Sequence, residues 1–253
     1  IEALSPHAKL GHLGGFLIDL TNGNIIDTKV NPERFHLTYS GDRYFVSNRQ
    51  EKTMKVYDRY TKEFIQDINY IPIMNKTITA SDDSTVFVFV ELTHTLQFWN
   101  VYTNELKDSY KIPNTPDIPK FSLIGDPSFS HDGRYFAYSL MANDNPNEYY
   151  FMVYDREARE IVFIQTLPIS QYSFVYSFMH TSNQIAYGEV VKLEGDDKPY
   201  SYIRIFDLDQ RKVIRNVRVG EEGNYVRALV NRNDDIFILY RISVSNETRF
   251  YDF

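Results

Sequence analysis

A short pattern recurs six times along the chain and constrains the fold more than any other feature of the sequence. In each copy, two apolar residues precede an Asp or Asn that ends a run typical of a β-strand. These anchor residues are Asp19, Asp58, Asn100, Asp155, Asp207 and Asp252. In the first five copies another apolar residue follows six positions later, namely Ile25, Phe64, Leu106, Ile161 and Val213. The anchors are 39, 42, 55, 52 and 45 residues apart, and spacings of this size indicate a repeat built from strands and turns.

Each full repeat also contains a polar turn between two apolar strands. The turns are Ser40-Gly41-Asp42, Ser81-Asp82-Asp83, His131-Asp132-Gly133, Ser182-Asn183 and Asn233-Asp234-Asp235. Gly, Asp and Asn tolerate the positive φ angles of tight hairpins, and the flanking strands are rich in aromatic and β-branched residues. The repeat therefore reads as four strands, a to d, joined by a hairpin, a loop and a second hairpin. We expect an all-β fold of four-stranded antiparallel blades, a β-propeller, with a β-sandwich as the alternative.

The repeat predicts one propeller domain over residues 1–253. Its complete blades cover about 31–75, 76–120, 121–172 and 173–222, and its partial blades cover 1–30 and 223–253. The first partial blade would hold strands c and d over Gly15 to Leu20 and Asn24 to Val30, and the last would hold a, b and c over 226–231, 236–242 and 248–253. Either the first strand d closes a small ring with the last blade, or the chain is a segment of a larger propeller. Both ends carry a copy of strand c, which favours the segment.

Nearly the whole chain resembles the WD-repeat family. Trp99-Asn100 is similar to the Trp-Asp dipeptide that ends strand c in that family, and Val56-Tyr57-Asp58 and Ile205-Phe206-Asp207 are similar to divergent versions of it. The resemblance implies a propeller that binds other proteins. The segment from Pro127 to Tyr138, which includes His131-Asp132-Gly133, resembles the blades of prolyl-oligopeptidase-type propellers. That second resemblance implies an accessory propeller that gates a hydrolase domain.

Composition argues against several classes of function. The net charge is −7 and no long basic run is present, so nucleic acid is not an expected partner. No run of apolar residues is long enough to insert into a membrane. The absence of Cys excludes disulfides and thiolate metal sites, and it fits a reducing compartment, so we expect a cytoplasmic location.

The sequence offers no catalytic constellation. It has neither the Gly-x-Ser-x-Gly elbow of serine hydrolases nor a phosphate-binding Gly-x-x-x-x-Gly-Lys loop. Its six His residues are scattered, whereas a zinc site needs three or four converging ligands. We expect no enzyme activity, no cofactor and no metal.

Three long connections are the candidate binding surface. They span Lys111 to Asp126, Met141 to Tyr149 and Val190 to Tyr200, and Tyr149, Tyr150, Tyr200 and Tyr202 flank the last two. Alternation of strand direction should place all three connections on one face, and loops above about 12 residues are usually functional or disordered. The candidate partner-binding residues are Asp117, Lys120, Asp144, Asn147, Glu148, Tyr149, Lys192, Asp196, Asp197, Lys198 and Tyr200.

These observations predict a non-catalytic scaffold in a multiprotein assembly. Its partners would be other proteins, with further blades of the same polypeptide as another possibility. The alternative, from the second resemblance, is the gating propeller of a hydrolase whose catalytic domain lies outside these residues.

Overall fold

The protein's structure is a computed structural model, and every regular element in its described part is a β-strand. The described residues are 3–4, 10–13, 16–19, 22–27, 35–37, 43–48, 53–58, 60–69, 85–90, 94–100, 103, 105–112, 121–142, 148–168, 176–221, 225–230 and 236–241. The chain forms two compact units, Ile1–Thr115 and Pro116–Phe253, which are described separately. Within the described residues no helix is both long and apolar enough to cross a membrane.

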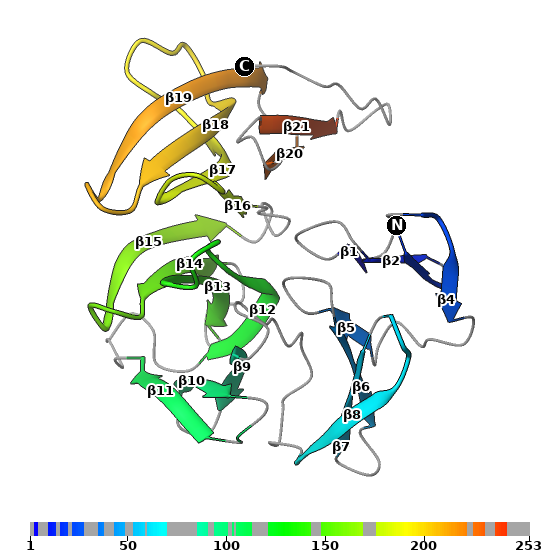
Figure 1. Ribbon diagram of the computed structural model, residues 1–253. Helices are drawn as coiled ribbons and strands as arrows, with labels where there is room; N and C mark the ends of the chain where they lie inside the picture. Colours follow the sequence, from blue (N-terminus) through cyan, green and yellow to red (C-terminus); the bar gives the residue numbers. More distant parts are fainter. Residues whose placement is uncertain are drawn as a thin grey trace. The chain divides into compact units, whose positions relative to one another are not determined.

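The first unit contains three antiparallel sheets (Figure 1). The first consists of β1 (Ala3–Leu4), β2 (Leu10–Leu13), β3 (Phe16–Asp19) and β4 (Ile25–Asp27). The second consists of β5 (Phe35–Leu37), β6 (Arg43–Asn48), β7 (Thr53–Asp58) and β8 (Phe64–Asn69). The third consists of β9 (Thr85–Val90), β10 (Thr95–Asn100) and β11 (Glu105–Lys111).

The second unit contains two four-stranded sheets and a two-stranded one. The first consists of β12 (Phe121–Phe129), β13 (Tyr135–Ala142), β14 (Glu148–Asp155) and β15 (Glu160–Pro168). The second consists of β16 (Tyr176–Phe178), β17 (Gln184–Val191), β18 (Tyr200–Asp207) and β19 (Lys212–Glu221). The third consists of β20 (Tyr225–Val230) and β21 (Ile236–Arg241).

The prediction of consecutive strands in four-stranded antiparallel sheets is confirmed, with two corrections. The sheet β1–β4 has four strands, whereas the sequence predicted only two. The additional strands are Leu10–Leu13, which pairs with β3, and Ala3–Leu4, which pairs with Leu10–Leu13. Their composition is weak for strands, so the backbone ladder of the neighbouring strand decides their conformation. The predicted last strand, over 248–253, lies outside the described residues.

The second correction shortens the three predicted connections. β12 begins at Phe121, so the segment from Phe121 to Asp126 is strand where a loop was predicted. Likewise β13 extends to Ala142 and β14 starts at Glu148, while β17 and β18 leave only residues 192–199 between them. Loop length alone is therefore a weaker argument for function than the sequence indicated.

The repeated pattern marks one kind of hairpin. The anchors Asp19, Asp58, Asn100, Asp155 and Asp207 are the last residues of β3, β7, β10, β14 and β18. The side chains of four of them, Asp58, Asn100, Asp155 and Asp207, accept hydrogen bonds from turn backbone. Asp58 Oδ1 accepts from Tyr60 N (2.8 Å) and Thr61 N (2.9 Å), and Asp155 Oδ1 accepts from Glu157 N (2.9 Å) and Ala158 N (3.1 Å). A carboxylate or amide oxygen thus satisfies donors that the turn would otherwise leave unpaired.

Two further regularities follow the anchors. After Asp19, Asp58, Asp155 and Asp207, the residue four positions later has a positive φ, namely Gly23 (75°), Lys62 (61°), Arg159 (59°) and Arg211 (54°). The apolar residue six positions later pairs with the residue before the anchor, as Ile25 does with Ile18 and Val213 with Phe206. In all five hairpins the register then shifts by one residue, which is a β-bulge in the outer strand.

Aromatic side chains pack between the two four-stranded sheets of the second unit. The buried cluster takes Tyr135, Ala137, Tyr149, Phe151, Val153, Val162, Phe163 and Leu167 from the first sheet and Ile185, Tyr187, Phe206 and Leu208 from the second. The Phe163 ring lies 4.4 Å from that of Phe206, and Tyr176 OH donates to Ala137 O across the interface (3.1 Å). Because large aromatics bury about 150–250 Å² each, this interface is a major source of the unit's apolar burial.

The left-handed turn residue gives the first prediction. Arg159→Val should destabilise the second unit by about 1–2 kcal/mol, because a β-branched side chain is strained at positive φ. Arg159→Gly should be neutral or slightly stabilising. Ala158→Val, in the same turn but without a positive φ, is the control, and urea unfolding followed by circular dichroism is the measurement. Equal losses for the two Val variants would contradict the turn geometry.

Candidate binding surfaces

The predicted partner-binding residues fall into three groups. Asp117, Lys120, Asp144 and Asn147 lie outside the described residues. Glu148 is the first residue of β14. The remaining six, Tyr149, Lys192, Asp196, Asp197, Lys198 and Tyr200, are described with their side chains.

Tyr149 and Tyr200 do not form an exposed aromatic surface. Tyr149 is only 1% exposed and belongs to the core between the two sheets. Tyr200 is 5% exposed and lies at the start of β18 beneath the loop that precedes it. Their apolar rings are therefore part of the packing, and this corrects the expectation that they face a partner.

The loop between β17 and β18 is held in shape by its own acidic residues. Tyr202 OH donates to both carboxylate oxygens of Asp196 (3.0 and 2.9 Å), and Asp196 Oδ2 accepts from Leu193 N (2.9 Å). Tyr200 OH donates to Asp197 Oδ1, and Lys192 Nζ donates to Asp197 O (3.2 Å). The two adjacent acids thus fix both halves of the loop to β18.

Electrostatics agree with these contacts. The hydrogen bond from Tyr200 lowers the pKa of Asp197 and raises that of the Tyr200 hydroxyl. Burial and the bond to Asp196 raise the pKa of Tyr202. The Arg218 guanidinium lies over the Tyr200 ring and Lys198 Nζ lies 5.6 Å from its centre. Lys192, Glu194, Asp197 and Lys198 remain exposed, so the loop presents both signs of charge on a fixed backbone.

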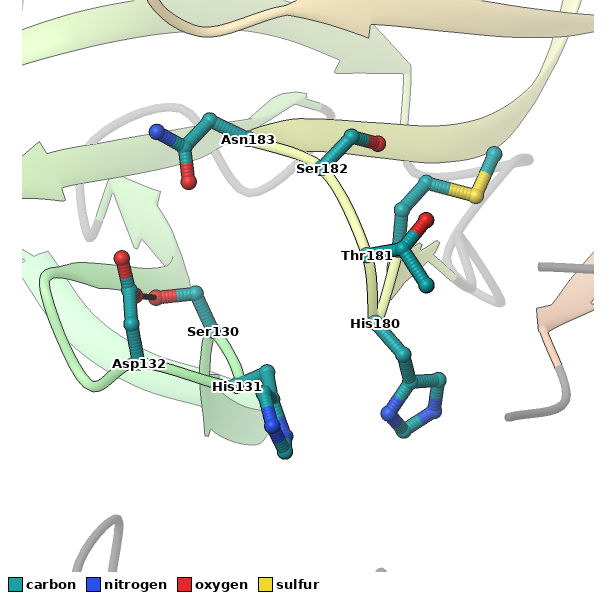
Figure 2. Close-up of a pocket in the computed structure, with 8 residues that line it drawn as sticks. Ser130, His131, Asp132, His180, Thr181, Ser182 and Asn183 are labelled. Atoms are coloured by element: carbon teal, nitrogen blue, oxygen red, sulfur yellow. Dashed lines mark hydrogen bonds between the residues drawn. The ribbon is translucent and has the colours of Figure 1, made fainter. Parts of the chain in front are cut away.

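A polar hollow of about 340 Å³ lies at the hairpin turns of the two four-stranded sheets of the second unit (Figure 2). Its lining residues are Ser130, His131, Asp132, Met179, His180, Thr181, Ser182 and Asn183. The imidazoles of His131 and His180 lie 5.8 Å apart, whereas the Asp132 carboxylate accepts from Ser130 Oγ (2.6 Å) and Arg134 N (3.0 Å) within its own turn. No group of three or more His, Asp or Glu residues in the described part of the chain could hold a metal ion.

Next to this hollow, Arg134 joins the two sheets. Its guanidinium binds Asp155 at 2.7 Å and Asp209 of the neighbouring sheet at 3.4 Å. Asp209 also accepts from Tyr135 OH (2.8 Å) and from Asn183 Nδ2 (3.0 Å), and these bonds lower its pKa. Burial raises the pKa of Asp155, but the bonds from Arg134 and the turn amides outweigh it, so the pKa lies below its ordinary 3.8.

The sequence identified both turns of the hollow, but only as turns. His131-Asp132-Gly133 and Ser182-Asn183 occupy the same position in consecutive repeats, and neighbouring sheets bring such positions together. That equivalence is the signal that predicts their proximity. The sequence places Tyr202 beside the loop but gives no sign of its bonds to Asp196. Arg218 reaches the Tyr200 ring through the pairing of β18 with β19, which has no local signal in the sequence.

No protein-family model matches the chain, and no curated protein matches it. Among solved structures, hydrazine synthase of Kuenenia stuttgartiensis aligns over 93% of this chain and 72% of its own length, with a TM-score of 0.56 and 15% sequence identity. At this identity the likeness concerns the fold alone. It is consistent with a propeller-like arrangement of four-stranded sheets.

The loop contacts give the second prediction. Tyr202→Phe should loosen the loop, because the charge-assisted bonds to Asp196 are lost. Hydrogen exchange of the Leu193 amide should become roughly tenfold faster. Tyr60→Phe, in an exposed turn of the first unit, should leave it unchanged. Unaltered Leu193 protection in Tyr202→Phe would show that Asp196 does not order the loop.

The Arg134 cluster gives the third prediction. Asp155→Ala should cost about 3 kcal/mol at neutral pH, because it leaves Arg134 without the buried carboxylate. Asp207→Ala, at the same repeat position but contacting Gln210 instead of an Arg, should cost about 1 kcal/mol. Urea unfolding monitored by circular dichroism measures both.

The excess cost of Asp155→Ala should depend on pH in one direction. Because the folded pKa of Asp155 lies below 3.8, its contribution is complete above that pH and is lost as the pH falls through the folded pKa. A difference between wild type and Asp155→Ala that persists unchanged into strong acid would contradict this assignment.

Proposed function

We propose that the protein is a non-catalytic scaffold of β-propeller type that binds another protein, with the loop between β17 and β18 in the contact. The repeated hairpins support the finer fold, because the same turn, left-handed residue and bulge recur at blade-length intervals. The lack of Cys in the sequence favours a reducing compartment such as the cytoplasm.

The observation that carries the proposal is the preorganised loop. Asp196 and Asp197 are bonded to hydroxyls of β18, so the exposed Lys192 and Lys198 lie on an ordered backbone. A surface that is ordered before binding loses less conformational entropy when it meets a partner. An ordered loop of this kind favours recognition of a partner over the alternative, in which the loop is extra length without a function.

The chemistry of the loop favours a protein partner. Lys192, Lys198, Glu194 and Asp197 place both signs of charge within a few residues. Such mixed charge steers and orients a complementary protein surface, whereas a polyanion requires cations alone. The exposed atoms are polar, so the contact resembles the rim of an interface and not its apolar core.

The experiment compares two double charge reversals in the intact protein. Lys192→Glu with Lys198→Glu alters the loop, and Lys62→Glu with Lys111→Glu makes the same charge change at exposed positions of the first unit. Proteins captured by the wild type from the native source are identified by mass spectrometry, and each is then titrated with the purified variants.

For a partner that uses the loop, the loop variant should lose about tenfold or more in affinity, and the control should stay near wild type. Unfolding curves verify that both variants are folded. Equal affinities of the two variants for every captured partner would refute the loop as the contact.

A further inference from the structure

The outer strand of the second four-stranded sheet carries an exposed row of cations. β19 spans Lys212–Glu221 and is the last strand in the order of its sheet, with β18 on one side only (Figure 1). Lys212, Arg215 and Arg218 are exposed, and Ile214 is 43% exposed at the bulge. Among the described residues no acidic side chain forms an ion pair with Lys212 or Arg215.

The strand register places two of these cations on the same face. Lys212 is opposite Asp207 and Arg215 is opposite Ile205, and these partners are two residues apart on β18. Side chains two residues apart on a strand point to the same face and are separated by about 7 Å. Acidic residues at alternate positions of an extended peptide have the same spacing.

Protection of a sheet edge against aggregation does not account for this row. Charges on edge strands do hinder unwanted pairing. However, β15 is the outer strand of the neighbouring sheet, contains no Lys or Arg, and leaves Ile164 54% exposed. β11 carries two acids with its two lysines, and β8 has Asp67 as its single charge. Of these outer strands, only β19 carries cations with no acid between them over most of its length.

We propose that the outer edge of β19 binds an extended acidic segment of another protein, in which alternate Asp or Glu residues pair with Lys212 and Arg215. The edge also offers backbone N–H and C=O groups to an added strand. This inference goes beyond the proposed function, because it concerns the outer strand and a defined chemistry of partner, not the loop.

An acidic peptide fits the site better than a nucleic acid does. Three exposed cations neutralise only a few charges, and the chain as a whole carries −7. Nucleic-acid binding depends on many phosphate contacts, so the negative field of the rest of the protein opposes it. A short acidic segment meets only the local positive row.

The test measures binding of a fluorescein-labelled peptide of alternating glutamate and threonine to the intact protein at low salt, by fluorescence anisotropy. Lys212→Glu with Arg215→Glu reverses the row while keeping charged residues on the edge. Lys62→Glu with Lys111→Glu is the matched control, since it makes the same charge change at exposed positions of the first unit. A single-stranded oligonucleotide and a peptide with lysine in place of glutamate complete the set.

The wild type should bind the glutamate peptide, bind the lysine peptide far more weakly, and lose affinity as salt is added. The β19 reversal should weaken binding by about tenfold or more, and the control Lys62→Glu with Lys111→Glu should bind as the wild type does. Absence of wild-type binding, equal binding by the β19 reversal, or tighter binding of the oligonucleotide than of the peptide would overturn the proposal.

Discussion

A side-chain oxygen at the end of β7, β10, β14 and β18 fixes the turn that leads into the outer strand of each of these four sheets. In the hairpin after β14, Asp155 Oδ1 accepts from the amides of Glu157 and Ala158, which fixes the turn and places Arg159 at positive φ. The chain can then re-enter the sheet only with an extra residue, so a bulge follows in the outer strand. The bulge determines which outer-strand residues face solvent, and in β19 it accompanies the exposure of Ile214. What the outer strands present to a partner therefore depends on turn chemistry several residues earlier.

Apolar packing and a buried ion pair act at different places between the sheets. The buried cluster at the interface is apolar and half of it is aromatic, but Glu189 lies 2.7 Å from Arg204 and accepts from Gln165 of the neighbouring sheet (3.2 Å). Burial raises the pKa of Glu189 more than Arg204 lowers it, so desolvation dominates at this position. A buried pair of this kind contributes little net stability, yet misplacing either partner leaves a charge uncompensated. The pair therefore penalises wrong alignments of the two sheets more than it strengthens the correct one.

The sequence predicted the strands and hairpins well because their signals are local. An Asx residue after two apolar residues encodes a turn in its own neighbourhood, and the structure places the first five anchors at strand ends. Pairing across strands has no such local signal. The weak strand β2 forms because β3 supplies a ladder, and Phe121 joins β12 because Ala142 lies opposite it. The exposure of Tyr149 was predicted wrongly for a similar reason. A residue beside a loop can still point into the core, and a shift of one residue in the strand register decides whether it faces the core or the solvent.

The net charge is a poor guide to the surface that a partner meets, because the described acids and cations make different contacts. Asp155 and Asp209 share Arg134, while Asp196 and Asp197 accept from tyrosine hydroxyls, so these four carboxylates are engaged in internal bonds. In contrast, Lys212 and Arg215 extend from an outer strand without an acidic partner among the described residues. Since Coulomb interactions between exposed groups fall off within about 10 Å at ordinary salt, a partner responds to these local groups and not to the total of −7. An acidic protein can in this way present a positive surface to its partner, provided that its carboxylates are held by the fold.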